Sequence, residues 1–210
     1  MGCGGSKTKD TNDKKNTNYS VVIFVLGGPG SGKGTQCTKL KDNHKFIHIS
    51  TGDLLREEQE KKGPEAEYIK ATLAEGKLVK SDILVTLIKN KFDQHKNTKF
   101  LLDGFPRSQE NIESWNNIIG KSIDAPAVLY FDCSDETMTK RIMGRAQTSG
   151  RIDDNEEAIK KRLVVFHEQT VPVIKTFDNL KKLIKVNSEG APNDVYVNTE
   201  KALKGIKVIS

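Results

Sequence analysis

Apolar and polar positions alternate along this chain in blocks that predict strands and helices in turn. Short apolar runs, typical of strands buried on both faces, occur at residues 21–26, 46–50, 99–104, 127–132 and 182–187. Segments with apolar residues at helical spacing lie between most of these runs. The clearest is residues 80–95, with Ile83, Leu84, Leu87, Ile88 and Phe92. The pattern predicts five strands joined largely by helices.

The helices are expected from about Ser31 onward, at 53–75 in two parts broken at Gly63-Pro64, and at 80–95, 134–145, 155–178 and 193–204. Pro172 should kink or divide the helix over 155–178. Strands that alternate with helices imply βαβ units with right-handed crossovers. We therefore expect an α/β, three-layer fold with a five-stranded parallel sheet and helices on both faces.

The first 19 residues differ from the rest of the chain. They show no apolar periodicity and are mostly small or polar, so residues 1–19 are expected to be a disordered tail before a folded domain over 20–210. The tail begins Met1-Gly2-Cys3-Gly4-Gly5-Ser6, which fits the N-myristoylation pattern with Gly2 as acceptor, and Cys3 could take a palmitoyl group. The alternative is an unmodified start. Stable membrane association would need a second acyl chain or nearby lysines.

The first apolar run leads directly into a glycine-rich stretch, Gly27-Gly28-Pro29-Gly30-Ser31-Gly32-Lys33-Gly34-Thr35. Backbone without Cβ atoms can wrap its N–H groups around an anion, and the N-terminus of the following helix adds favourable potential. Lys33 can reach the β- and γ-phosphates of a nucleotide. A strand before and a helix after indicate a phosphate-binding loop rather than a plain turn.

Two further polar groups follow predicted strands, at the edge where parallel sheets bind ligands. Thr51 comes after the second strand, and Asp103-Gly104 ends the third. A carboxylate at Asp103 can hold Mg²⁺ directly or through water, or it can cap a helix; the loop around Lys33 favours the metal role. We expect these groups to share one edge of the sheet.

Six arginines occur in this lysine-rich chain, in segments that flank the inferred site: Arg56, Arg107, Arg141, Arg145, Arg151 and Arg162. Phosphoryl transfer requires charge on phosphate oxygens to be neutralised, and the planar guanidinium fork suits that task. Residues 144–151 are predicted to form a short basic loop between helices, with the composition of a mobile lid. Closure of such a lid would exclude water from the reaction.

Composition narrows the function classes only slightly. A net charge of +6 suits anionic substrates, nucleic acid or an anionic membrane, but the basic residues are not interleaved with aromatics as in nucleic-acid-binding modules. Three widely separated cysteines without CxxC spacing indicate a reducing, cytoplasmic compartment and no structural zinc site. No apolar run approaches the roughly 20 residues of a membrane span.

Two other patterns carry no functional prediction. Asn90-Lys91-Phe92-Asp93 matches the guanine-binding NKxD motif, but it lies in a predicted helix and precedes the strand that ends at Asp103, the reverse of the GTPase order. The histidines have no metal-ligand spacing and are expected to be ordinary surface or half-buried residues: His44, His48, His95 and His167.

Four motifs resemble those of the adenylate kinase and UMP-CMP kinase family, and most closely the UMP-CMP kinases: Gly27 to Gln36, Ser50 to Arg56, Asp103 to Arg107 and Gly150 to Asn155. The likeness runs from about residue 20 to the C-terminus. It implies reversible phosphoryl transfer from Mg·ATP to a nucleoside monophosphate, without a phosphoenzyme, by a monomer with Mg²⁺ as cofactor. It also implies a monophosphate-binding segment at about 50–80 and a short lid at about 143–153.

The resemblance assigns residues to each substrate. It implies that ATP contacts Gly28, Gly30, Ser31, Gly32, Lys33, Gly34, Thr35, Arg141, Arg145 and Gly190. It implies that the monophosphate contacts Thr51, Arg56, Lys77, Leu78, Val79, Gly104, Phe105, Arg107, Asn111, Arg151 and Arg162. The catalytic set that it implies is Lys33, Arg107, Arg145, Arg151 and Arg162, with Asp153 and Asp154 orienting the arginines.

Two positions disagree about the acceptor base. Asn111 is similar to the UMP-CMP kinases and should face the base directly, whereas adenylate kinases usually carry Gln there. Thr51 is similar to the adenylate kinases, since pyrimidine members usually carry Ala. Lys80 stands where the family has Pro, so the acceptor-side connector departs from the pattern. Asn111 has the greater weight, which favours UMP and CMP over AMP.

A protein of a different class, a lipid-anchored adapter that binds nucleotide without turnover, is the remaining alternative. The presence of Lys33, Asp103 and the arginines argues against it.

Overall fold

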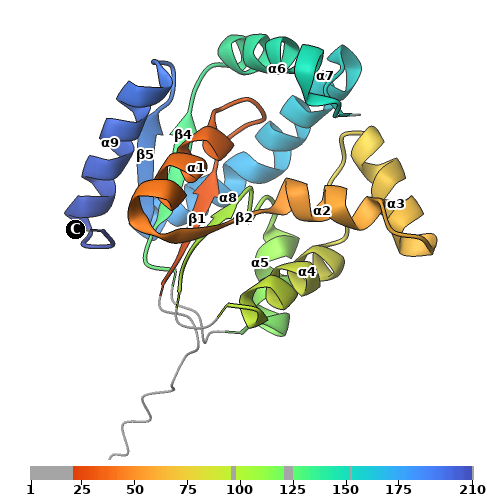
Figure 1. The fold of residues 1–210 in the computed structure, drawn as a ribbon, viewed down its shortest axis with the longest axis horizontal. Coiled ribbons are helices and arrows are strands. Elements are labelled where there is room, and N and C mark those ends of the chain that lie inside the picture. Colours follow the sequence, from red (N-terminus) through yellow and green to blue (C-terminus); the bar gives the residue numbers. More distant parts are fainter. Residues whose placement is uncertain (1–20, 96–97, 121–124, 152, 210) are drawn as a thin grey trace, which may run out of the picture.

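A five-stranded parallel sheet forms the centre of the molecule (Figure 1). The structure is a computed structural model that describes residues 21–95, 98–120, 125–151 and 153–209. The strands are β1 (Val21–Leu26), β2 (Phe46–Ser50), β3 (Lys99–Asp103), β4 (Val128–Asp132) and β5 (Leu183–Asn187). Their order is β2-β3-β1-β4-β5, and every neighbouring pair is parallel. The predicted α/β fold is confirmed.

Helices connect the strands and cover both faces of the sheet (Figure 1). They are α1 (Lys33–His44), α2 (Thr51–Gln59), α3 (Pro64–Ala74), α4 (Ser81–Asp93), α5 (Gln109–Ile118), α6 (Asp135–Ser149), α7 (Glu156–Val165), α8 (Val171–Asn179) and α9 (Pro192–Gly205). A π-helical segment, η1 (Phe166–Thr170), joins α7 to α8. The predicted division of the helix over 155–178 is therefore confirmed, with Pro172 in the first turn of α8.

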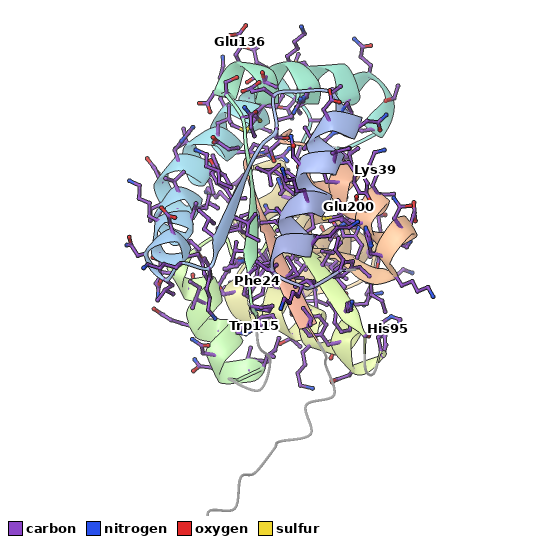
Figure 2. All side chains as sticks on the ribbon, turned by 90° about the vertical axis from the view of Figure 1, so that its left-hand side faces the viewer. Phe24, Lys39, His95, Trp115, Glu136 and Glu200 are labelled. Carbon is purple, nitrogen blue, oxygen red and sulfur yellow. The ribbon has the colours of Figure 1, made fainter. Side chains whose placement is uncertain are left out.

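Side chains that alternate along β1 build one core on each face of the sheet. Ile23 and Val25 belong to a buried cluster with residues of α1 and α9. Phe24 belongs to the other cluster, with residues of α4, α5 and α8. Figure 2 shows Phe24 beside Trp115 of α5, and their ring centroids lie 5.1 Å apart in an edge-to-face arrangement. Both faces of the central strand are thus covered, as its continuous apolar sequence predicts.

Three helical features depart from the sequence predictions. The apolar pattern predicts no helix between β3 and β4, yet α5 lies there, capped by Ser108 Oγ, which accepts from the backbone N–H of Asn111 at 3.2 Å. The predicted loop over 144–151 is wrong, because α6 continues to Ser149 and ends at Gly150, whose φ is 62°. Finally, α1 begins at Lys33 rather than near Ser31.

The parallel arrangement places the carboxyl ends of all five strands at one edge of the sheet and Val21 at the opposite edge. The loop after β1, Ser50, Asp103 and Asn187 therefore share the carboxyl edge. The expectations for the tail, including acylation of Gly2 and Cys3, lie outside the described residues. Within the described ranges, no helix combines the length and apolar character that crossing a bilayer requires.

Candidate functional site

The loop between β1 and α1 is fixed by contacts with α6 and with the end of β5, in a conformation that can bind an anion. Gly30 has a φ of 82°, and a Cβ there would lie 2.4 Å from the backbone oxygen of Met138, so only glycine fits. Ser188 Oγ donates to the carbonyl oxygen of Ser31 at 2.6 Å and ties the loop to the end of β5. The N-terminal turn of α1, with Gly34 and Thr35, lines the cavity beside this loop. Its N–H groups provide a site for phosphate.

Lys33 is held against the loop from which it projects. Its ammonium group donates to the carbonyl oxygens of Gly27 and Gly28, each at 2.8 Å. Burial lowers the pKa of Lys33 from 10.5 to about 8; the Asp103 carboxylate opposes this shift, and the positive charge of Arg107 adds to it. The lysine is thus poised to exchange its contacts with carbonyl oxygens for phosphate oxygens.

A cavity of about 720 Å³ opens at the carboxyl edge of the sheet. Every arginine of the chain lines it: Arg56, Arg107, Arg141, Arg145, Arg151 and Arg162. Among the described residues, Lys33 is the one lysine in its wall, although lysines greatly outnumber arginines in the sequence. Guanidinium groups therefore gather where a polyphosphate would bind, while most lysines lie elsewhere.

A smaller cavity of about 100 Å³ adjoins the first, between the sheet edge and α2, α3 and η1. Leu55, Lys77, Leu78, Gly104 and Phe166 are among its lining residues. The two cavities share part of their walls, namely Pro29, Lys33, Gly52, Arg56, Arg107 and Arg162. Two anionic ligands, one in each cavity, would consequently meet beside Lys33, Arg107 and Arg162.

Asp154 holds two of the arginines in place. Its side chain is 1% exposed and accepts from Arg145 Nε at 2.8 Å and from Ser149 Oγ at 2.7 Å, while Arg162 approaches it to 3.3 Å. Burial by itself would raise the pKa of Asp154, but the hydrogen bonds from Arg145 and Ser149 outweigh burial and lower it. The ionised carboxylate thus fixes guanidinium groups from α6 and α7. Asp153 pairs with Arg162 at 2.9 Å.

Asp53 in α2 connects two more arginines across the cavity. It accepts a hydrogen bond from Arg56 in the same helix, and Arg151 lies 3.7 Å away. Arg107 is fixed differently, since its Nε donates to the carbonyl oxygen of Gly104 at 2.7 Å. Arg141 donates to the carbonyl oxygens of Glu189 and Gly190, each at 3.3 Å. The cavity wall is therefore built from helices and from the loops that follow β3 and β5.

Asp103 lies beside the phosphate-binding loop at the end of β3. One of its carboxylate oxygens is 3.3 Å from His48 Nε2, and a Cβ on Gly34 would lie 3.7 Å from the same oxygen. Mg²⁺ takes one or two carboxylates together with phosphate oxygens and waters. A single carboxylate facing the loop fits that ion.

Several residues assigned by resemblance do not line either cavity in this structure. Val79 and Phe105 are core side chains with 5% and no exposure, and Gly28 and Ser31 lie behind the loop surface. The hydroxyl of Thr51 donates to the carbonyl oxygen of Asp103 at 2.9 Å. These residues shape the walls from behind.

Asn111 is buried and both ends of its amide are engaged within the protein. Its oxygen accepts from the backbone N–H of Arg107 at 2.9 Å, and its nitrogen donates to Ser81 Oγ at 2.8 Å. Asn111 lines neither cavity, but each end of its amide keeps one further donor or acceptor position, so the expectation that Asn111 faces an acceptor base stays a prediction.

Sequence reasoning did not single out Ser188, which lines the larger cavity. It follows β5, so the rule that ligands bind beyond the carboxyl ends of strands was the signal that could have found it. The same reasoning treated His48 as an ordinary residue, but it also lines the cavity, next to Asp103. Its position as the third residue of β2, near the carboxyl end of that strand, was the corresponding signal.

Comparisons with known proteins agree with this geometry. The family model for adenylate kinase matches residues 25–182. The chain is 39% identical over 184 residues to the UMP-CMP kinase of Mus musculus, an alignment that covers 84% of this chain and 93% of that protein. It is 46% identical over 175 residues to the UMP-CMP kinase of Prunus armeniaca, covering 83% and 74%, respectively. It is 42% identical over 187 residues to the uridylate kinase of Saccharomyces cerevisiae, covering 87% and 90%.

Proposed function

The chain belongs to the adenylate kinase family and is a nucleoside monophosphate kinase, and we propose that it transfers the terminal phosphoryl group of ATP reversibly to UMP or CMP. The observation that carries the proposal is the convergence of all six arginines and Lys33 on two adjoining cavities. The names of the relatives, UMP-CMP kinase and uridylate kinase, support the choice of acceptor.

ATP is proposed to occupy the larger cavity. Its phosphates would accept hydrogen bonds from the backbone between Gly30 and Thr35, where the N-terminus of α1 favours negative charge. Its adenine would lie against Arg141 and the backbone of Gly190, which line the same cavity. Arg145 would reach the phosphates from α6.

The monophosphate is proposed to occupy the smaller cavity. Arg56 and Arg107 would bind its phosphate, while the backbone at Lys77 and Leu78 would contact its nucleoside. Thr51, Val79, Phe105 and Asn111 line neither cavity and would support this site from behind, since they are buried next to residues of its walls. In domain terms, the acceptor segment is about 50–80 and the lid is about 143–153.

Transfer is proposed to proceed by direct displacement between the two nucleotides. A phosphate oxygen of the monophosphate attacks the γ-phosphorus, the bond to the β,γ-bridging oxygen breaks, and ADP leaves with a nucleoside diphosphate as the other product. Lys33, Arg107 and Arg162 stand where the cavities meet and would neutralise charge on the transferred group. Arg145 and Arg151 would close over it and exclude water.

Mg²⁺ is the cofactor that this reaction implies, and Asp103 is the residue proposed to hold it, directly or through water. The ion would supply charge neutralisation at the β- and γ-phosphates. Thr51 keeps the Asp103 segment in place by its hydrogen bond to the Asp103 carbonyl oxygen.

A coupled assay with Mg·ATP against CMP, UMP, dCMP, AMP and GMP tests the proposal. The largest kcat/KM is expected with CMP or UMP. A larger value with AMP would overturn the choice of acceptor, and no turnover with any monophosphate would leave an adapter that binds nucleotide. Lys33→Met should abolish transfer, whereas Lys41→Met, an exposed position in the same helix, is the matched control and should retain it.

We further propose that the enzyme works as a cytoplasmic monomer that is acylated at Gly2, with Cys3 as a second acceptor, and is thereby attached to a membrane surface. The sequence pattern Met1 to Ser6 supports this. Mass spectrometry after coexpression with an N-myristoyltransferase tests it, with Gly2→Ala as control. An unmodified glycine would contradict the proposal.

A further inference from the structure

Three potential metal ligands from three elements meet beside the phosphate-binding loop. They are Cys37 in α1, His48 in β2 and Asp103 in β3, and one ligand atom of each lies within 4.8 Å of the other two. They are the single group of this kind among the described residues. The mechanism proposed above uses Asp103 alone and gives no task to the thiol or the imidazole.

We propose that this cluster binds a divalent transition-metal ion of the zinc and cobalt class, and that the bound ion inhibits the enzyme. A thiolate, an imidazole and a carboxylate are ligands that Zn²⁺ takes together, whereas Mg²⁺ prefers oxygen ligands alone. The effect on activity rests on the proposed kinase function, but the binding does not.

The geometry is close to that of a zinc site. Ligand atoms around tetrahedral zinc lie roughly 3.5 Å apart, given bonds of about 2.0–2.3 Å. The separations in the cluster are all within 4.8 Å, so the longest needs to shorten by up to about 1.3 Å, whereas His48 Nε2 and an Asp103 carboxylate oxygen are already 3.3 Å apart. Cys37 is fixed by complete burial between α1 and the sheet.

The approach to the cluster runs through the larger cavity. The side chains of His48 and Asp103 are 15% and 10% exposed and line that cavity, while Cys37 lies behind them with no exposure. An ion would enter from the cavity, and a water molecule or a nucleotide phosphate would complete its coordination. Three protein ligands with one open position are typical of accessible rather than purely structural zinc sites.

The charges of the cluster match a divalent cation. Binding releases the thiol proton of Cys37 to solvent, and the thiolate and the Asp103 carboxylate then balance the two positive charges. Lys33 and Arg107 oppose binding with their positive charge, but the Lys33 ammonium is turned toward the carbonyl oxygens of Gly27 and Gly28.

Inhibition follows from competition for one carboxylate. Asp103 is the group proposed to hold Mg²⁺. A zinc ion held by Cys37, His48 and Asp103 together would occupy this carboxylate, so that Asp103 could no longer hold Mg²⁺. Because nitrogen and sulfur ligands bind Zn²⁺ far more strongly than Mg²⁺, excess Mg²⁺ should restore activity poorly.

The cluster cannot be recognised from ligand spacing in the sequence, since His48 and Asp103 are 55 positions apart.

Titration of the full chain with Co²⁺, without nucleotide, tests binding. One equivalent should produce a thiolate-to-cobalt charge-transfer band, and Zn²⁺ should displace the Co²⁺ and remove the band. Cys37→Ala should abolish the band and weaken binding by about 10-fold or more. Cys133→Ala is the matched control, a half-buried thiol outside the cluster, and should behave as wild type. An unchanged titration of Cys37→Ala, or no stoichiometric binding by wild type, would overturn the site.

Zn²⁺ inhibition of the kinase reaction tests the consequence. With each variant measured against its own rate in zinc-free buffer, Cys37→Ala and His48→Asn should need about 10-fold more Zn²⁺ for half-inhibition. His48→Asn covers the case in which the buried Cys37→Ala substitution fails to fold. Equal inhibition of all variants would overturn the inhibitory role. If no monophosphate is turned over, the kinase proposal fails, while the cobalt titration still decides the metal site.

Discussion

At the scale of single residues, the most informative group is Lys33. Burial lowers its pKa to about 8, so near pH 8 about half of the unliganded protein lacks this proton. The unfolded chain keeps the proton up to its ordinary pKa of 10.5. The contribution of Lys33 to stability therefore increases as pH rises from about 8 to 10.5, the window in which the unfolded state binds more protons.

Polyphosphate binding should reverse that shift and take up a proton. Negative charge beside Lys33 favours its charged form, so ATP binding at pH 8 should be accompanied by uptake of up to about 0.5 proton per site. Isothermal titration calorimetry in two buffers of different ionisation enthalpy measures this number. In Lys33→Met the uptake should disappear; the same uptake in that variant would assign the proton to another group.

Asp154 should matter both for stability and for turnover. Asp154→Asn keeps the shape but removes the charge that holds Arg145 and Arg162, so we expect Tm to fall by roughly 4–8 °C. Because the arginines lose their orientation, kcat should fall by about 10- to 100-fold. Glu157→Gln, which breaks an exposed pair with Lys161, is the control and should change neither. Calorimetry and the coupled assay provide the measurements, and wild-type turnover in Asp154→Asn would contradict the role.

At the scale of elements, three of the described helices are followed within two residues by a lysine in an unfavourable backbone conformation. Lys45, Lys181 and Lys207 follow α1, α8 and α9 with φ values of 58°, 54° and 58°, and all three are exposed. Glycine is usual at such positions because it lacks the Cβ that makes the left-handed region costly. The chain therefore carries avoidable strain at these helix ends.

Replacement of Lys45 by glycine should stabilise the fold. The substitution removes the cost of the left-handed conformation but gives the unfolded chain more conformational freedom. The net effect should raise the free energy of unfolding by about 0.5–1 kcal/mol. This corresponds to a rise in Tm of about 1–4 °C. Loss of the lysine charge also removes a favourable interaction with the helix dipole. Because high ionic strength screens that interaction, the melting curves of both proteins should be recorded at high ionic strength. Lys41→Gly, inside α1, is the control and should lower Tm.

The elements also show which parts of the fold the sequence determines locally. Buried strands were predicted closely, because a continuous apolar run flanked by glycine or polar residues leaves few alternatives. The amide-rich helix α5 was missed, since its helical state depends on packing of Trp115 against Phe24 and on the Ser108 cap. The end of α6 was placed too early, at residue 145 instead of Ser149, because Gln147, Thr148 and Ser149 are polar and continue no apolar pattern.

At the scale of the whole molecule, the sequence predicted which residues line the site but not the contacts between residues far apart in the chain. The rule that ligands bind beyond the strands identified Lys33, Asp103 and the arginines correctly as cavity residues. It could not show that the Asn111 amide donates to Ser81 Oγ, because that hydrogen bond joins positions 30 apart. For the same reason, only the fold brings Cys37 to His48 and Asp103.

Nucleotide binding should stabilise the whole molecule. Free ATP at 100 times its Kd adds about 2.7 kcal/mol to the free energy of unfolding, which corresponds to a rise in Tm of roughly 5–10 °C. Differential scanning fluorimetry with increasing ATP measures it. Lys33→Met should shift the dose dependence to higher ATP, and Lys41→Met should not. An identical response of both variants would mean that the phosphates bind away from the loop.

The position of Val21, at the edge of the sheet away from the cavities, has a practical consequence. A linker attached at Val21 would start on the side of the domain opposite the two cavities. A bead, a fusion partner or a bilayer attached through such a linker would lie on the side opposite the cavities. Both nucleotides could then still reach the cavities from solvent. Enzyme immobilised in this way should work as fast as enzyme in solution.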